Sequence, residues 1–363
     1  MPFFKRLNLS LMLPVMLLVA FSLLTLASLS ANDEPAFQVF KKQVVWFLLG
    51  FGVFFVLSNF FDHRLLYTQN FFSVAFYLFC LFLLVLVLLL GVKVRGAAGW
   101  LGFSFLRIQP VELAKLALII LLAKYFAIWH IEIWRPLRLI VPALYTGLYV
   151  FLCFLQPDLG SAILLILIWL GMLVVSGLKF KHFVILFIIG LIITGVAWNY
   201  FLHSYQKDRV LSFFNPTSDP LGAGYNVIQA KIAIGSGGFW GRGLGQGVET
   251  QLRFLPEAKT DFFLAAFVEE WGFFGGFLLC LVLTWFVFEL MSIGLRAPDN
   301  FSRLFVFGYL LLLASQIIIN FGANLGFLPV TGLPLPFLSY GGSNLLINFI
   351  ALGVIQSIKL RSV

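Results

Sequence analysis

Ten apolar stretches of about 20 residues decide what this chain of 363 residues can fold into. A helix of that length crosses roughly 30 Å of hydrocarbon. The chain is 61% apolar and 11% charged, whereas soluble domains are about half apolar and about a quarter charged. These values exclude a water-soluble enzyme and predict an all-α, polytopic membrane protein. The ten predicted spans are 9–30, 43–61, 68–92, 110–129, 138–155, 160–177, 182–201, 262–292, 303–325 and 341–358.

The positions of Lys and Arg predict the orientation of the spans. Twelve of these residues fall in short segments on the side of the N-terminus, and five fall in short segments on the other side. Because cytoplasmic segments are enriched in Lys and Arg, both termini are expected in the cytoplasm. The net charge of +9 is spread over several separate segments, which argues against nucleic-acid binding.

We expect one domain, 1–363, with a single long outer loop at about 202–261. A cleaved signal peptide is the alternative for the first stretch, but a run of about 20 apolar residues favours a retained span. Cys80, Cys153 and Cys280 lie singly in apolar runs and predict neither a disulfide nor a metal site.

Acidic residues gather near the outer face. An ionisable group at membrane depth costs several kcal/mol unless it is paired or hydrated, so such groups usually line a functional cavity. The nine acids in this group are Glu112, Asp158, Asp208, Asp219, Glu249, Glu257, Asp261, Glu269 and Glu270.

Glu112 and Lys115 are three residues apart, which places them on one face of a helix within reach of an ion pair. Pro110 suits the first turn of that helix. A purely structural salt bridge and a functional role in a cavity floor are equally compatible with this spacing.

Two aspartates are candidates for either capping or chemistry. Asp158 follows Pro157 in a tight turn, where spacing favours a helix N-cap. Asp261 precedes the eighth span, so capping is again the simpler interpretation. A base at a membrane mouth, with its pKa tuned by Glu269 and Glu270, is the alternative.

A glycine-rich run at 235–247 lies in the long loop. The phosphate-binding pattern G-x-x-x-x-G-K-[ST] is absent from it. The run therefore predicts a close-packed loop with turns at positive φ.

Five motifs, in order along nearly the whole chain, closely resemble the SEDS (shape, elongation, division and sporulation) membrane proteins, above all their rod-shape branch. The motifs are Gln109–Lys115, Gln156–Gly160, Asp219–Gly238, Phe254–Glu257 with Thr260-Asp261, and Pro334–Ser343.

This resemblance implies a peptidoglycan glycosyltransferase that polymerises lipid II at the outer face of the bacterial cytoplasmic (inner) membrane during cell elongation. It implies a class B penicillin-binding protein and other elongation-complex membrane proteins as partners, and Mg²⁺ or Mn²⁺ as cofactor. By the same resemblance Asp261 matches the essential aspartate. The substrate-binding candidates are Glu112, Lys115, Asp158, Arg209, Lys231, Lys259 and Ser343, and the metal candidates are Asp261 and Asp158.

The sequence departs from the family pattern at Gly99, Val248, Glu249 and Lys259, where the family usually has Arg, Thr, Gln and His. These changes leave the candidate base, Asp261, in place. They concern how the diphosphate and the metal are held.

Inversion at the donor's anomeric carbon needs one base for the acceptor hydroxyl and positive charge for the departing diphosphate. A single carboxylate, Asp261, is enough for the first task. A lipid II flippase and a non-catalytic scaffold for the penicillin-binding protein are the alternative functions.

Overall fold

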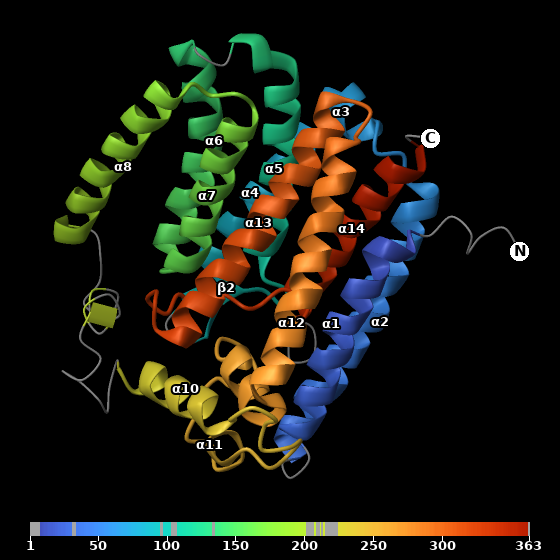
Figure 1. Ribbon diagram of the computed structural model, residues 1–363. Helices are drawn as coiled ribbons and strands as arrows, with labels where there is room; N and C mark the ends of the chain where they lie inside the picture. Colours follow the sequence, from blue (N-terminus) through green and yellow to red (C-terminus); the bar gives the residue numbers. More distant parts are fainter. Residues whose placement is uncertain are drawn as a thin grey trace, which may run out of the picture.

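The computed structural model describes residues 8–30, 34–94, 97–102, 107–132, 135–200, 207, 211, 213–214 and 224–361. Each of the ten predicted spans corresponds to a long helix in this structure (Figure 1). These helices are α1 (Leu9–Ser28), α2 (Glu34–Phe60), α4 (Asn70–Leu90), α5 (Pro110–Trp129), α6 (Pro136–Leu155), α7 (Leu159–Val175), α8 (Phe180–Tyr200), α12 (Phe263–Leu295), α13 (Asn300–Leu325) and α14 (Gly342–Arg361).

Among the described residues, eight of these helices have the length and composition to cross a membrane. Of the other two, α7 has 17 residues and α5 carries Glu112, Lys115 and Lys124. The chain is therefore a multi-pass, helical membrane protein.

Shorter elements connect the helices: α3 (Leu65–Thr68), a 3₁₀ turn (His130–Glu132), α10 (Tyr225–Ser236) and α11 (Val248–Gln251). A small antiparallel hairpin, β1 (Val92–Val94) with β2 (Ala97–Trp100), separates α4 from α5. We expected only helices, and this hairpin is the exception. Its first strand alternates β-branched Val with Lys, a pattern that fits a pleated strand.

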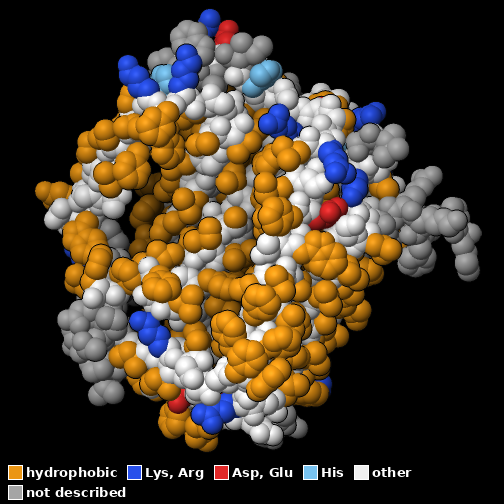
Figure 2. Space-filling model, viewed as in Figure 1, with side chains coloured by type: hydrophobic (Ala, Val, Ile, Leu, Met, Phe, Trp, Pro, Cys, Tyr) orange, Lys and Arg blue, Asp and Glu red, His pale blue; other side chains and the backbone are white. Residues whose placement is uncertain are grey.

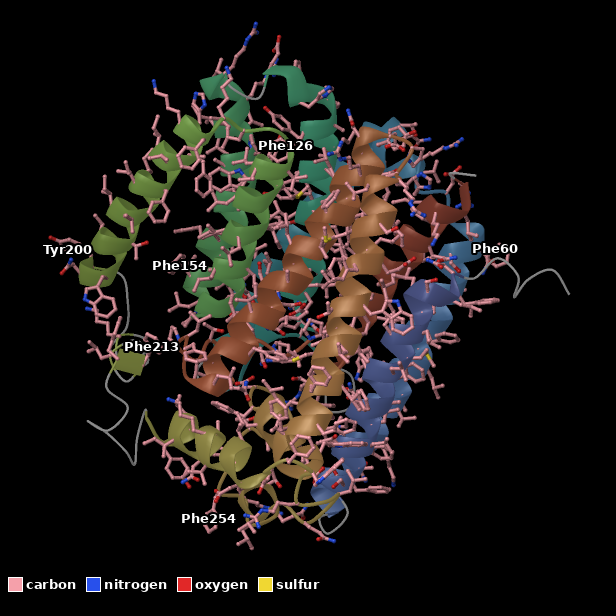
Figure 3. All side chains as sticks on the ribbon, in the orientation of Figure 1. Phe60, Phe126, Phe154, Tyr200, Phe213 and Phe254 are labelled. Carbon is pink, nitrogen blue, oxygen red and sulfur yellow. The ribbon has the colours of Figure 1, made fainter. Side chains whose placement is uncertain are left out.

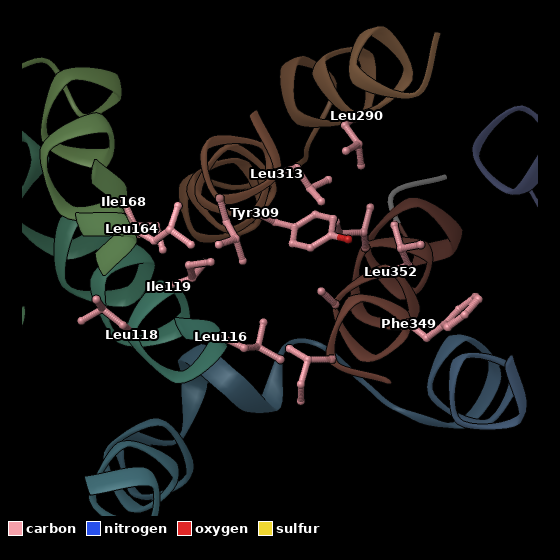
Figure 4. Packing of buried hydrophobic residues seen from close by; sticks show 14 of the residues in the cluster. Leu116, Leu118, Ile119, Leu164, Ile168, Leu290, Tyr309, Leu313, Phe349 and Leu352 are labelled. Atoms are coloured by element: carbon pink, nitrogen blue, oxygen red, sulfur yellow. The ribbon is translucent and has the colours of Figure 1, made fainter. Parts of the chain in front are cut away.

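Helix α13 lies at the centre of the bundle and packs against α5, α7 and α12. Its Tyr309 and Leu313 meet Ile119 of α5 and Leu352 of α14 in the buried core (Figure 4). A Cβ on Gly308 would lie 2.7 Å from Ile119, so the absence of a side chain lets α13 approach α5 closely.

The two ends of the bundle differ in character. Helix α1 begins and α14 ends at the same side, where Asn8 and Lys359 both donate hydrogen bonds to Glu289. The opposite end, which the distribution of Lys and Arg predicts to be the outer one, carries α10, α11 and their loops, with Phe254 far from Phe126 (Figure 3). Helix α8 stands apart from the other helices (Figure 1), and none of its described side chains is buried.

Candidate active site

Asp261 lies in a turn at the outer end, immediately before α12. Its main-chain oxygen accepts hydrogen bonds from the side-chain amides of Asn320 (3.0 Å) and Asn324 (2.9 Å) on α13. Asn324 also accepts a bond from the N–H of Ala265 (3.1 Å), which is one of the unpaired donors in the first turn of α12. The residue that precedes α12 is Phe262, so Asp261 does not occupy the N-cap position that its spacing had favoured.

The two residues before Asp261 are fixed in the same way. The carbonyl of Thr260 accepts from the hydroxyl of Ser339 (2.6 Å), and the carbonyl of Lys259 accepts from the N–H of Tyr340 (2.8 Å). Three consecutive carbonyls, from 259 to 261, are therefore held by α13 and by the segment before α14. Main-chain contacts of this kind fix the position of Asp261 independently of its carboxylate.

The carboxylate of Asp261 faces the segment 331–333. Its Oδ2 lies 3.8 Å from the place where Gly332 would carry a Cβ, and Gly332 has a φ of 73°. The next residue, Leu333, accepts a hydrogen bond from Asn320 (2.9 Å). The side chain of Asn320 therefore links Asp261 to the segment that its carboxylate faces.

The start of α7, which Asp158 precedes, packs against the same segment. The carboxylate of Asp158 accepts from the N–H of Ser161 (3.0 Å), which confirms the predicted N-cap. Two residues later, a Cβ on Gly160 would lie 2.5 Å from the carbonyl oxygen of Thr331. The start of α7 and the turn at Asp261 thus flank one short stretch of chain, although Asp158 and Asp261 are 103 positions apart in the sequence.

Glu112 and Lys115 form the predicted ion pair within α5, with 2.7 Å between Oε1 and Nζ. Both side chains are buried. The second carboxylate oxygen of Glu112 accepts from Asn344 of α14 (3.1 Å). Asn344 in turn accepts from Asn348, which accepts from the hydroxyl of Tyr309. The pair is therefore part of a polar network that joins three helices.

Ser343 lies beside this network. Its hydroxyl accepts from the N–H of Gln109 (3.0 Å) and donates to the carbonyl of Arg107. Ser343 thus ties the segment before α5 to the start of α14. Burial raises the pKa of neighbouring Tyr340, whereas the positive charge of Arg107 acts against that rise.

The candidate cations are distributed around the outer end. Lys231 of α10 fills the space beside Gly326, where α13 ends and its carbonyls favour a positive charge. Lys259 belongs to the turn of Asp261. Arg209 lies outside the described residues, as do Asp208 and Asp219.

A model of the FtsW/RodA/SpoVE family, described as "Cell cycle protein", matches residues 5–362. The chain belongs to this family. The stage V sporulation protein E of Bacillus subtilis is 36% identical over 362 residues, which are 97% of this chain and 96% of that protein. Peptidoglycan glycosyltransferase MrdB of Escherichia coli is 37% identical over 289 residues, 78% of this chain and 76% of its own.

Solved structures of family members have the same fold. A chain of a peptidoglycan synthase complex, described as coordinating polymerization and crosslinking, superimposes with a TM-score of 0.82 at 31% identity, covering 98% of both chains. The rod shape determining protein RodA of Thermus thermophilus gives a TM-score of 0.72 at 30% identity, covering 97% of this chain and 96% of that one.

In this family member, Glu269 and Glu270 hold the glycine-rich loop. The carboxylate of Glu269 accepts from the N–H groups of Glu249 and Thr250, at the start of α11. That of Glu270 accepts from Ser28 of α1 and from Gly245. These hydrogen bonds give both acids a structural role in the loop.

The predicted close packing of that loop is confirmed. Gly238, Gly241, Gly243 and Gly245 all have positive φ.

Sequence reasoning missed Asn320, Asn324 and Asn344. All three are buried in apolar helices, where an amide is stable only with hydrogen-bond partners. The four-residue spacing of the first two placed them on one face of the span. The spacing of Asn320 and Asn324 could be seen in the sequence. Their partner could not, because Asp261 lies about 60 positions away from both.

Proposed function

We propose that this chain polymerises lipid II into glycan strands at the outer face of the bacterial cytoplasmic membrane, with Asp261 as general base. Its activity class, peptidoglycan glycosyltransferase, follows from membership of the family that includes MrdB. One observation supports the role of Asp261. The carbonyls of residues 259 to 261 are all hydrogen-bonded, which holds the backbone of Asp261 rigidly, and its carboxylate faces Gly332.

In the proposed reaction, the carboxylate of Asp261 takes the proton of the acceptor's sugar hydroxyl. The hydroxyl oxygen forms a bond to the donor's anomeric carbon as the bond from that carbon to the diphosphate breaks. The anomeric centre inverts and the lipid diphosphate leaves. A rigidly held base is suited to this step because no reorganisation is needed when the proton moves.

The departing diphosphate needs positive charge. Lys231, Lys259 and Arg209 are our candidates for direct contact. Lys115 is already paired with Glu112, so we assign these two to the inner side of the site with Ser343, where they support the bound substrate.

The described residues contain no cluster of three or more metal-ligating His, Cys, Asp or Glu side chains. Mg²⁺ is nevertheless held in many enzymes by one or two carboxylates, waters and substrate phosphates. Asp261 and Asp158 are the two carboxylates that we propose for this donor set. When bound, Mg²⁺ or Mn²⁺ would neutralise charge on the diphosphate.

The prenyl tails need an apolar space open to lipid. Figure 2 shows a hollow between α8 and the rest of the bundle, lined by hydrophobic side chains. We assign the prenyl chain to this hollow.

The partner proposed for this chain is a class B penicillin-binding protein, which would cross-link the strands, within the elongation complex. The similarity to a chain of a peptidoglycan synthase complex supports an assembly of this type. The similarity to a rod shape determining protein supports the role in elongation.

The test uses the full chain with its class B partner in lipid nanodiscs, with the transpeptidase blocked and labelled lipid II and Mn²⁺ supplied. Wild type should give a ladder of glycan products, and Asp261→Asn should give none. Asp299→Asn is the matched control, because Asp299 caps α13 at the other end and Asn also caps well. A ladder from Asp261→Asn would remove this residue as the base, and no ladder from any variant would favour the flippase or the scaffold.

A further inference from the structure

Helix α12 is broken once, and the break sets its depth in the membrane. Gly272 has φ 72° and ψ −172°, outside the helical region. The whole of α12 has 33 residues, about 50 Å, which exceeds the roughly 30 Å of a hydrocarbon core. The part that follows the break, 273–295, measures about 35 Å and by itself suits a slightly tilted span. The break therefore falls at the level of the outer interface.

The glycine-rich loop fills this break with main-chain hydrogen bonds. The N–H groups of Phe273 and Phe274, freed by the break, donate to the carbonyls of Gly238 (2.9 Å) and Phe239 (3.0 Å). On the other side, the carbonyls of Glu269 and Glu270 accept from the loop residues 242 and 243. The loop and α12 are thereby one rigid unit at this depth.

Gly241 and Gly272 make this close approach possible. A Cβ on either residue would overlap the main chain of the other segment. Larger residues at these two positions would separate the loop from the helix.

This unit carries four exposed aromatic side chains in mutual contact, which we name the aromatic tip: Phe239, Trp240, Phe273 and Phe274. Trp240 is 74% exposed and its ring centroid lies 5.5 Å from that of Phe274. A cluster of exposed rings of this size on a rigid support requires an apolar environment.

The surface around the tip indicates what that environment is. Exposed Phe277, Leu281 and Phe288 continue from the tip along α12 at helical spacing, towards the cytoplasmic end. Figure 2 shows hydrophobic side chains along this part of the molecule. Arg242, two residues beyond Trp240, is exposed at the point where lipid phosphates would begin.

We propose that the aromatic tip is a membrane anchor, which inserts the end of the glycine-rich loop into the outer leaflet at the boundary between headgroups and acyl chains. Trp and Phe rings at this level, with an adjacent Arg, match the chemistry of that boundary. The anchor fixes the height of the short outer part of α12. That part starts two residues after Asp261, so the anchor also sets the height of Asp261 above the bilayer; only this last consequence rests on the proposed function.

The test measures depth directly, on the full chain in nanodiscs. An environment-sensitive fluorophore is attached at Trp240→Cys after the exposed Cys280 has been replaced by Ser; Cys80 and Cys153 are buried and stay. The matched control is Gln246→Cys, an exposed position in the same loop. Lipids that carry a nitroxide near the headgroup, and separately a water-soluble quencher, report which side each label occupies.

We expect the label at 240 to emit at shorter wavelength and to lose fluorescence to the lipid nitroxide, whereas the label at 246 loses fluorescence to the aqueous quencher. Equal behaviour of the two labels would overturn the proposal. Loss of lipid contact at 240 when the class B partner is added would also overturn it, because the tip would then be a protein interface.

A second variant, Phe239→Ser with Trp240→Ser, tests the consequence for Asp261. We expect slower lipid II polymerisation in nanodiscs, with Gln246→Ser as the unaffected control. If wild type itself does not polymerise lipid II, the proposed function fails while the depth measurement still decides the anchor.

Discussion

The ion pair between Glu112 and Lys115 allows a test that separates its structural role from its functional role. Lys115 is fully buried, and its Nζ lies 2.7 Å from the carboxylate. Glu112→Leu leaves that ammonium group uncompensated, at a cost of roughly 3–5 kcal/mol. It also removes the acceptor of the Asn344 amide, at a further cost of about 1–3 kcal/mol for an unpaired buried donor.

The double variant Glu112→Leu, Lys115→Met removes the buried charge together with its partner. Only the cost at Asn344 then remains, so the double variant should be more stable than Glu112→Leu by about 3–5 kcal/mol. Asn344→Leu is the matched control, because it alters the same network but leaves the ion pair intact.

Thermal melting in nanodiscs measures the stability of these variants, and the lipid II ladder measures their activity. We expect the double variant to regain most of the melting temperature but not the ladder, because Lys115 is assigned to the support of the bound substrate. A double variant that regains both would show that the pair is only structural. A double variant that melts as low as Glu112→Leu would refute the electrostatic reasoning itself.

Three further outcomes are expected. Asn324→Leu removes one of two amides bonded to the carbonyl of Asp261, and it should lower kcat more than it changes KM in initial-rate assays; an unchanged kcat would mean that the second amide suffices. Gly241→Ala places a Cβ against the main chain of α12 at a φ of 86°, so limited proteolysis should cut the outer loop faster than in the control Gly235→Ala, which points into open space; equal cleavage would contradict the close packing. Burial and a neighbouring carboxylate raise the pKa of Glu249, so the native state loses stability as pH rises through that raised pKa. Glu249→Gln should then melt at a higher temperature than wild type at neutral pH and lose this advantage in acid. A difference in melting temperature that does not vary with pH would contradict a raised pKa of Glu249.

The elements that could be predicted from the sequence depend on local patterns. The length of each apolar run gave the ten helices, because crossing a bilayer imposes a minimum number of residues. The spacing of Glu112 and Lys115 predicted their contact, and the turn at Pro157 predicted the cap at Asp158, since both interactions form within one helical turn.

The features that could not be predicted depend on contacts between distant segments. The break at Gly272 is stable because loop residues about 30 positions earlier in the chain supply its missing hydrogen bonds. The expected cap at Asp261 is absent for a similar reason. The amide oxygen of Asn324 satisfies the N–H of Ala265, so the first turn of α12 has a partner from another helix.

The departure from the family pattern at Lys259 can be interpreted from these contacts. Lys259, Thr260 and Asp261 are held through their carbonyl oxygens, and a carbonyl is the same group whichever side chain the residue carries. Replacing the usual His by Lys at 259 therefore changes the charge near the proposed base without moving its backbone. By the same argument, Asp261→Asn keeps every one of these main-chain bonds, so a loss of activity in that variant would report on the carboxylate itself.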